Sequence, residues 1–208
     1  MSIIERLGLA VPIFQAPMAG VSTPALAAAV SEAGGLGALG LGAGDADAAR
    51  KLIRDTRTRT ARPFNVNLFV HADPVEDPTS EAAWLDALTP AFSEADAAPP
   101  TALRTIYRSF AGDDAMLAML IDERPAVVSF HFGLPDAERL AALREAGRLL
   151  VASVTSPAEA QAAQRAGIDA VVAQGIEAGG HLGIFDPDAS DDALTTLALT
   201  RLLVKQVS

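Results

Sequence analysis

Short apolar runs alternate with longer stretches rich in alanine and leucine along most of the chain. Short apolar runs bounded by turn residues are typical of buried parallel strands, and the longer stretches are typical of helices. The apolar runs predict strands at residues 11–16, 36–41, 64–69, 126–131, 149–154 and 170–174. The stretches between them predict helices at residues 23–33, 45–56, 136–146, 157–166 and 191–205. Repeated strand–helix units indicate an α/β fold with a parallel sheet and right-handed crossovers.

The connection between the third and fourth predicted strands is much longer than the others. It covers residues 71–124 and carries the only tryptophan, Trp84, and the only tyrosine, Tyr107. A connection of this length usually forms additional helices and often covers a site. We therefore expect a single domain over residues 1–208, in which residues 71–124 form a helical insert that can act as a lid.

Uncommon polar residues stand where the predicted strands end. Gln15, Asn67, His131 and Gln174 each lie at or near the end of a strand, and Thr155 directly follows another. In closed barrels and in open parallel sheets, ligands bind at the carboxyl ends of the strands. The sequence therefore predicts a site where these side chains converge.

Strand alternation sharpens the prediction for one histidine. Ser129 and His131 share one face of their strand, while Phe130 and Phe132 share the other, where we expect them to pack under helices. The strand at residues 64–69 places two asparagines on one face in the same way. A lone histidine is often only a satisfied core residue, but a Ser/His face at a strand end favours an active site.

Residues 174–181 form a glycine-rich loop directly after the last apolar run. Glycine has no Cβ and tolerates positive φ, so backbone N–H groups can approach a phosphate or the edge of a flavin. The glycines alone fit an ordinary strand-to-helix turn equally well. Gln174 and His181, at the two ends of the loop, favour a site.

The composition excludes several classes of protein. The chain has 208 residues, half of them hydrophobic, and its formal net charge of −10 argues against nucleic acid as a partner. It contains no cysteine, so disulfides, thiolate metal sites and thiol nucleophiles are excluded. No apolar run is long enough to span a bilayer, and the first residues are too polar for a signal peptide. A cytoplasmic protein without a membrane partner is the expectation.

Metal and serine-hydrolase chemistry are also disfavoured. No histidine and carboxylate have the spacing of helical metal ligands, so no metal site is expected. His71 lies in a loop with acidic neighbours and is expected to be a surface residue. The Gly-x-Ser-x-Gly pattern of a strained serine nucleophile is absent.

Six segments resemble, in the same order, motifs of the FMN-dependent nitronate monooxygenases, once called 2-nitropropane dioxygenases. They are residues 12–20, 34–37, 64–69, 129–133, 154–156 and 174–181. Each motif alone is weak evidence, whereas all of them in order are specific. The resemblance implies a TIM-type (β/α)8 barrel that holds FMN at the carboxyl ends of its strands. It also implies an oxidoreductase that acts on a small nitronate or nitroalkane.

The resemblance assigns roles to individual residues. His131 matches a catalytic histidine that takes a proton from a neutral nitroalkane or, when protonated, holds an anionic nitronate. His181 matches a second histidine beside the flavin, with a supporting role in substrate binding. The implied FMN contacts are Ala16, Pro17, Met18, Asn67, Gln174, Gly179 and Gly180. The implied reaction converts a nitronate, such as propionate 3-nitronate, and O2 into a carbonyl compound and nitrite.

A barrel of this kind has eight strands, and the sequence predicts six. Family members continue into a seventh and an eighth strand, whose loops form the usual phosphate site, so we expect an incomplete barrel, truncated before the seventh strand. Two other interpretations of function stay open. One is an FMN-dependent enoyl-thioester or quinone reductase that uses NAD(P)H, and the other is an inactive remnant that needs a complementary chain. An open doubly wound sheet is the alternative fold.

Overall fold

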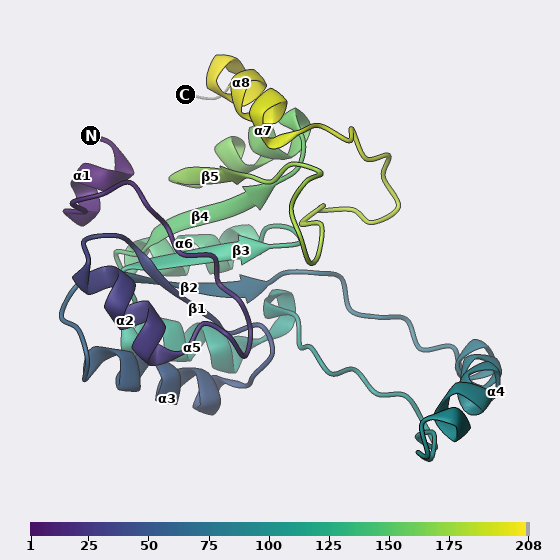
Figure 1. Ribbon diagram of the computed structural model, residues 1–208. Helices are drawn as coiled ribbons and strands as arrows, with labels where there is room; N and C mark the ends of the chain where they lie inside the picture. The colour runs from purple at the N-terminus through teal and green to yellow at the C-terminus, as the bar shows by residue number, and fades with distance from the viewer. Residues whose placement is uncertain (207–208) are drawn as a thin grey trace. The chain divides into compact units, whose positions relative to one another are not determined.

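The computed structural model describes residues 1–206 and is built around a five-stranded parallel sheet in the order β1-β2-β3-β4-β5 (Figure 1). The strands are β1 (Gly37–Gly40), β2 (Phe64–Phe69), β3 (Val127–His131), β4 (Leu149–Val154) and β5 (Ala170–Ala173). Each strand pairs in parallel with the next one along the chain. A doubly wound sheet reverses its strand order at a switch point. The unbroken order therefore confirms the predicted incomplete TIM-type barrel and argues against the doubly wound alternative.

The first predicted strand, at residues 11–16, is reduced to an extended segment with a single bridge, between Phe14 and Leu36. Gln15 N donates to Leu36 O at 2.9 Å beside this bridge. Beyond it, the side chain of Gln15 replaces the backbone as the partner of β1. Gln15 Nε2 donates to Ala38 O at 3.1 Å, and Ala38 N donates to Gln15 Oε1 at 3.2 Å. The side-chain amide thus ends the backbone ladder after one bridge.

The helices outside residues 73–107 largely agree with the predicted helices. They are α1 (Ile3–Leu7), α2 (Pro24–Glu32), α3 (Ala46–Arg57), α5 (Asp114–Glu123), α6 (Ala137–Glu145), α7 (Pro157–Arg165) and α8 (Thr196–Gln206), with a short 3-10 helix, η1 (Phe110–Gly112). α8 begins at Thr196 rather than at residue 191, because the carboxylate of Glu177 accepts hydrogen bonds from Thr196 N and Thr196 Oγ1. No helix within residues 1–206 is both long and apolar enough to cross a membrane.

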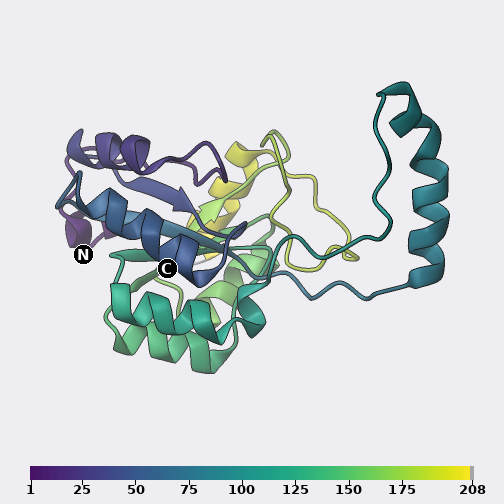
Figure 2. The same cartoon turned by 90° about the horizontal axis from the view of Figure 1, so that it is seen from below.

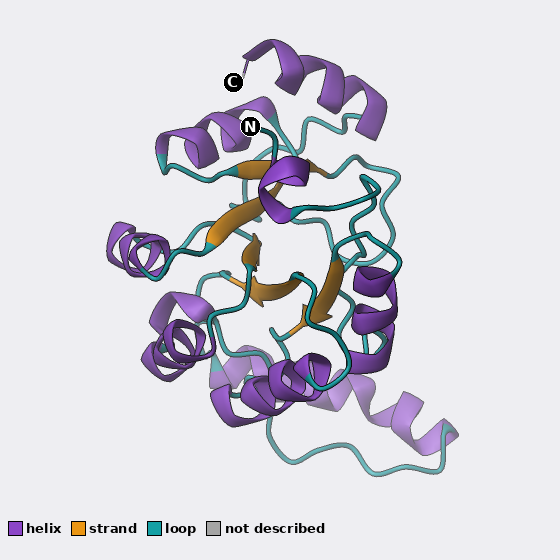
Figure 3. Ribbon diagram, turned by 90° about the vertical axis from the view of Figure 1, so that its left-hand side faces the viewer, coloured by secondary structure: helices purple, strands orange, loops and turns teal. Residues whose placement is uncertain are grey.

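Apolar side chains on the outer face of the sheet form the main core. Val66 and Leu68 of β2, Val128 and Phe130 of β3 and Leu150 of β4 are all buried there. The helices α3, α5 and α6 supply the other half of this core and lie side by side along the sheet (Figure 2). In the view along the strands, helices lie around the outside of the curved sheet (Figure 3). The outer face of the sheet therefore packs against helices.

The inner face of the sheet is apolar at one end only. Val127, Leu149 and Val151 pack there against Ile3 and Leu7 of α1. This contact covers the end of the inner face at which the strands begin. Asn65 is level with Val127, and the polar side chains of Asn67, Ser129 and His131 follow towards the carboxyl ends of the strands.

Residues 73–107 form a compact unit of their own. It contains α4 (Pro78–Glu94), which begins after Asp77, whose Oδ1 accepts hydrogen bonds from Thr79 N and Ser80 N at 3.1 Å each. α4 buries none of its residues, and Trp84 is exposed. The rest of the predicted insert, including α5, belongs to the unit that contains the sheet. The lid role expected for the insert stays a prediction.

Candidate active site at the carboxyl ends of the strands

Two asparagines and a serine form a buried polar cluster on the inner face of the sheet. Asn67 of β2 pairs in register with Ser129 of β3. Asn65 Nδ2 and Asn67 Nδ2 both donate to Ser129 Oγ, at 2.8 and 2.9 Å. Asn65 Oδ1 is buried and has no hydrogen-bond partner among the described residues. A buried acceptor without a partner is costly, so the inner face retains a position suited to a donor from a bound molecule.

A tight loop carries Ala16, Pro17 and Met18 to the end of β1. Ser22 holds this loop, because its Oγ accepts a hydrogen bond from Met18 N at 2.9 Å and donates one to Ala16 O at 3.1 Å. A Cβ on Gly40 would lie 2.9 Å from Ala19 N and 3.2 Å from the carbonyl carbon of Met18. Gly40 is the β1 residue in register with Asn67. The structure therefore brings this loop beside the asparagine cluster.

The loop after β5 folds back over the end of β3. Gly183 N donates to Gln174 Oε1 at 2.6 Å, and Gln174 Nε2 donates to His181 O at 3.0 Å. A Cβ on Gly183 would lie 2.6 Å from His131 Cε1. The chain thus lies directly against the His131 imidazole, and Gln174, His181 and His131 meet as the sequence predicts.

The environment of His131 favours its neutral form. Burial lowers the pKa of His131 below its ordinary value, because a charged imidazole is costly to desolvate. Two smaller effects come from His181. A hydrogen bond to its backbone raises the pKa of His131, whereas the charge of its side chain lowers this pKa. A neutral imidazole at neutral pH can accept a proton, which suits a general base.

Phe132 departs from the face predicted for it. The strand ends at His131, and Phe132 has a φ of +67°, so alternation no longer sets its direction. Its ring centre lies 4.4 Å from that of His131, 5.7 Å from that of His181 and 6.4 Å from that of His71. Phe130, by contrast, packs in the outer core as expected. The prediction that Phe132 packs under helices is wrong.

His71, predicted to be a surface residue, lies near the same ring. It is only partly exposed, and its ring lies at the edge of the Phe132 ring. Its Nδ1 lies 2.9 Å from the carbonyl oxygen of Ala72, which fixes the ring relative to the backbone. All three histidines of the chain therefore surround one phenyl ring.

Gly179 and Gly180 lie in the exposed part of the loop after β5. A Cβ at either position would have no neighbour within 4 Å, and Gly180 has a φ of +79°. The structure does not bring these two glycines into contact with the other predicted residues. Their predicted role in cofactor binding stays a prediction.

Glu159 is a residue of the site that the sequence interpretation missed. It lies in the first turn of α7, and its Oε2 accepts hydrogen bonds from Thr155 N at 2.6 Å and Thr155 Oγ1 at 3.0 Å. Its Oε1 accepts a hydrogen bond from Phe185 N at 2.8 Å. Glu159 therefore ties the loop after β5 to the end of β4. A serine followed three residues later by a glutamate is the pattern of a capping box, and Ser156 and Glu159 have this spacing. The pattern could have indicated that Glu159 binds backbone at the start of α7.

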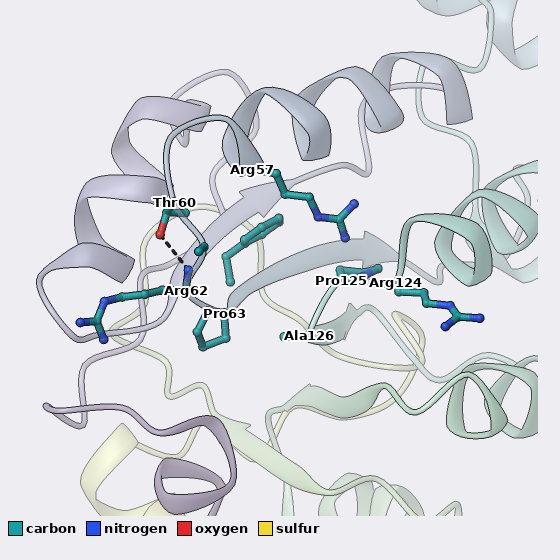
Figure 4. Close-up of a pocket in the computed structure, with 9 residues that line it drawn as sticks. Arg57, Thr60, Arg62, Pro63, Arg124, Pro125 and Ala126 are labelled. Atoms are coloured by element: carbon teal, nitrogen blue, oxygen red, sulfur yellow. Dashed lines mark hydrogen bonds between the residues drawn. The ribbon is translucent and has the colours of Figure 1, made fainter.

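An open pocket of about 530 Å³ lies at the other end of the sheet, where β2 and β3 begin (Figure 4). Arg57, Arg62 and Arg124 contribute to its wall. Arg57 is held by the buried carboxylate of Glu123, with 2.7 Å between Nη1 and Oε2. Barrel chemistry occurs at the carboxyl ends of the strands, so we assign the candidate site to the histidine end of the sheet and not to this pocket.

A family model described as Nitronate monooxygenase matches residues 2–208. The chain belongs to the nitronate monooxygenase family. A relative of that name from Paraburkholderia phytofirmans is 58% identical over 205 residues, which are 99% of this chain and 56% of the relative. Another from Pseudomonas aeruginosa is 54% identical over 202 residues, which are 97% of this chain and 58% of the relative. The chain thus spans somewhat more than half the length of these curated relatives.

Solved structures agree with this membership. A nitroalkane oxidase from Streptomyces ansochromogenes superposes with a TM-score of 0.86 at 41% identity, covering 100% of this chain and 58% of that one. FabK from Thermotoga maritima superposes with a TM-score of 0.69 at 31% identity, covering 99% of this chain and 51% of that one. The family's fold is therefore present over the whole of this chain, as an incomplete barrel.

Substitution of Gly183 by alanine tests the packing of the loop against His131. The added methyl would overlap His131 Cε1, Gln174 Oε1 and His131 Nδ1, at 2.6, 2.9 and 3.0 Å. We expect Gly183→Ala to lower the free energy of unfolding by about 1–3 kcal/mol, measured by urea denaturation, and to shift the His131 ring resonances in NMR spectra. Gly179→Ala is the matched control, because nothing lies within 4 Å of its Cβ position. Equal behaviour of the two variants would contradict this arrangement.

The lowered pKa of His131 predicts a pH dependence of stability. The unfolded chain binds a proton at His131 at higher pH than the folded chain does, so stability is fully present above the unfolded value of about 6.5 and falls as pH drops below it. We expect His131→Gln to flatten this decline. The measurement is the urea midpoint as a function of pH for both proteins. Parallel curves would show that His131 is not desolvated in the folded state.

Proposed function

We propose that the protein to which this chain belongs is an FMN-dependent nitronate monooxygenase that converts an alkyl nitronate and O2 into a carbonyl compound and nitrite. The observation that carries the proposal is the desolvated imidazole of His131, held against the loop after β5 at the carboxyl ends of the strands. Family membership supports the same activity. The activity belongs to the whole protein, of which this chain corresponds to somewhat more than half in its relatives.

The chain's own residues fit a flavin at this end of the sheet. The amide of Asn67 lies on the inner face at the level of Gly40, where the absence of a Cβ lets the Ala16–Met18 loop approach closely. Met18 is exposed and free to lie against a flat ring. We assign Ala16, Pro17, Met18 and Asn67 to one side of the flavin. The orphaned Oδ1 of Asn65 marks the same interior as incomplete without a bound donor.

The loop after β5 supplies the remaining proposed contacts. The side chain of Gln174 is fixed by its bonds to Gly183 and His181 and stands beside His131. Gly179 and Gly180 present backbone without side chains, which suits a phosphate chain. FMN, when bound, supplies the redox chemistry between the substrate and O2. Placement and proton transfer are left to the protein.

His131 has two roles in this proposal. As a neutral imidazole it takes the α-proton of a nitroalkane, and burial favours this form by lowering its pKa. Once protonated, it holds the anionic nitronate by charge and by a hydrogen bond. His181 lies at the exposed side of the site, with its backbone oxygen bound to Gln174. We assign its imidazole to the substrate.

The test uses the purified protein supplied with FMN and propionate 3-nitronate in two assays. Nitrite release is measured in air, and flavin absorbance is followed in a separate anaerobic assay. We expect nitrite release and loss of flavin absorbance in the wild type. His131→Asn should lower kcat/KM for neutral nitroalkanes by about 100- to 10,000-fold, because proton transfer is lost. The loss for preformed nitronates should be smaller, since no proton need be removed.

Two results would contradict the proposal. Rapid NADPH oxidation with an enoyl thioester or a quinone, without nitrite from nitronates, would indicate the reductase instead. Failure to retain FMN would favour the alternative of an inactive remnant that needs a complementary chain. Gly179→Ser tests flavin retention separately, because a side chain at position 179 would not touch His131.

A further inference from the structure

Phe132 occupies a backbone conformation that its residue type disfavours. It directly follows β3 and has a φ of +67°, and Gly133 after it has a φ of +135°. Left-handed backbone is uncommon for residues with a side chain and is a strained state for a bulky one. A glycine would adopt the same φ without strain. The ring of Phe132 must therefore make contacts that offset this strain.

The ring of Phe132 lies among the three histidines and Phe69. The phenyl ring meets the His131 ring at an interplanar angle of 66° with 4.4 Å between centroids, and the His181 ring at 83° with 5.7 Å. His71 lies at 6.4 Å and Phe69 at 5.0 Å. These residues come from the ends of β2 and β3 and from the loop after β5. The left-handed turn places the ring at their centre.

Core packing alone does not account for this position. Phe130, two residues earlier, is 0% exposed and lies in the outer hydrophobic core, whereas Phe132 is partly exposed and belongs to none of the described core clusters. Strained residues that persist are concentrated at functional sites, where surrounding contacts hold them. Phe132 is such a residue beside the group that we propose for proton transfer.

We propose that Phe132 is a positioning residue, whose ring orients the imidazoles of His131 and His181 and keeps water from the face of His131. This proposal deepens the proposed function, because it rests on His131 as the proton-transfer group. The titratable side chains around His131 are His181, from the loop after β5, and His71, across the Phe132 ring. The burial that lowers the pKa of His131 supports the shielding.

NMR titration of the histidine rings tests the positioning role without any activity. The chain has only three histidines, so their rings can be assigned with one His→Gln variant each. In Phe132→Leu and Phe132→Ala, we expect the His131 pKa to rise towards its ordinary value and the His181 resonances to shift, because both rings lose their partner. Unchanged His131 and His181 titrations in either folded variant would overturn the proposal.

Phe130→Leu is the matched control, because it changes the same residue type two positions earlier, on β3, where the side chain packs in the outer core. It should lower stability and leave the His131 titration as in the wild type. Phe132→Gly separates strain from ring contact, since glycine relieves the backbone at φ +67°. It should melt at a higher temperature than Phe132→Ala and still show the raised His131 pKa. If His131 in Phe132→Gly had the same pKa as in the wild type, this would contradict the role of the ring.

The kinetic test uses the protein loaded with FMN. Phe132→Leu should lower kcat for a neutral nitroalkane by about tenfold, because the base is no longer held in one orientation, and should move the acidic limb of the pH profile to higher pH. KM should change by less than about twofold, since the ring makes no bond to substrate. If the wild type has no nitronate activity, the proposed function fails, while the NMR titration still decides the positioning role.

Discussion

The two hydrogen bonds of the Gln174 side chain are the interaction on which the candidate site depends. They bind Gly183 N and His181 O, and so fold the loop after β5 back over the end of β3. Gly183 can lie against His131 only because it has no side chain. The same contact takes the imidazole out of water, which lowers its pKa. The position of this loop therefore contributes both to the geometry of the site and to the lowered pKa of His131.

The sheet and the approximate position of the site could be predicted from the sequence. The apolar runs predicted the bounds of β2 and β4 without a shift, because the outward-facing residues along both strands are apolar and buried under helices. Alternation correctly placed Asn67 and His131 on the inner face, since side-chain direction in a strand follows directly from residue number. The meeting of His131 with Gln174 and His181 could also be predicted, because parallel strands end at the same edge of a sheet.

The rest could not be predicted because it depends on side chains that bind distant backbone. The Gln15 amide replaces the expected ladder with β1, and the Glu159 carboxylate joins two loops that are far apart in sequence. Alternation also fails where a strand stops, which is why Phe132 does not pack under helices as predicted. Each of these departures lies at the candidate site. Local rules fail most often where function imposes its own geometry.

We propose that the flavin binds at the carboxyl ends of the strands, with His131 at their rim. A crystal structure of the whole protein with FMN tests it most directly. We expect the flavin ring between the Ala16–Met18 loop and Gln174, within hydrogen-bond distance of Asn67 and beside the His131 imidazole. A flavin at the opposite end of the sheet, in the pocket of Arg57, or remote from His131, would contradict it.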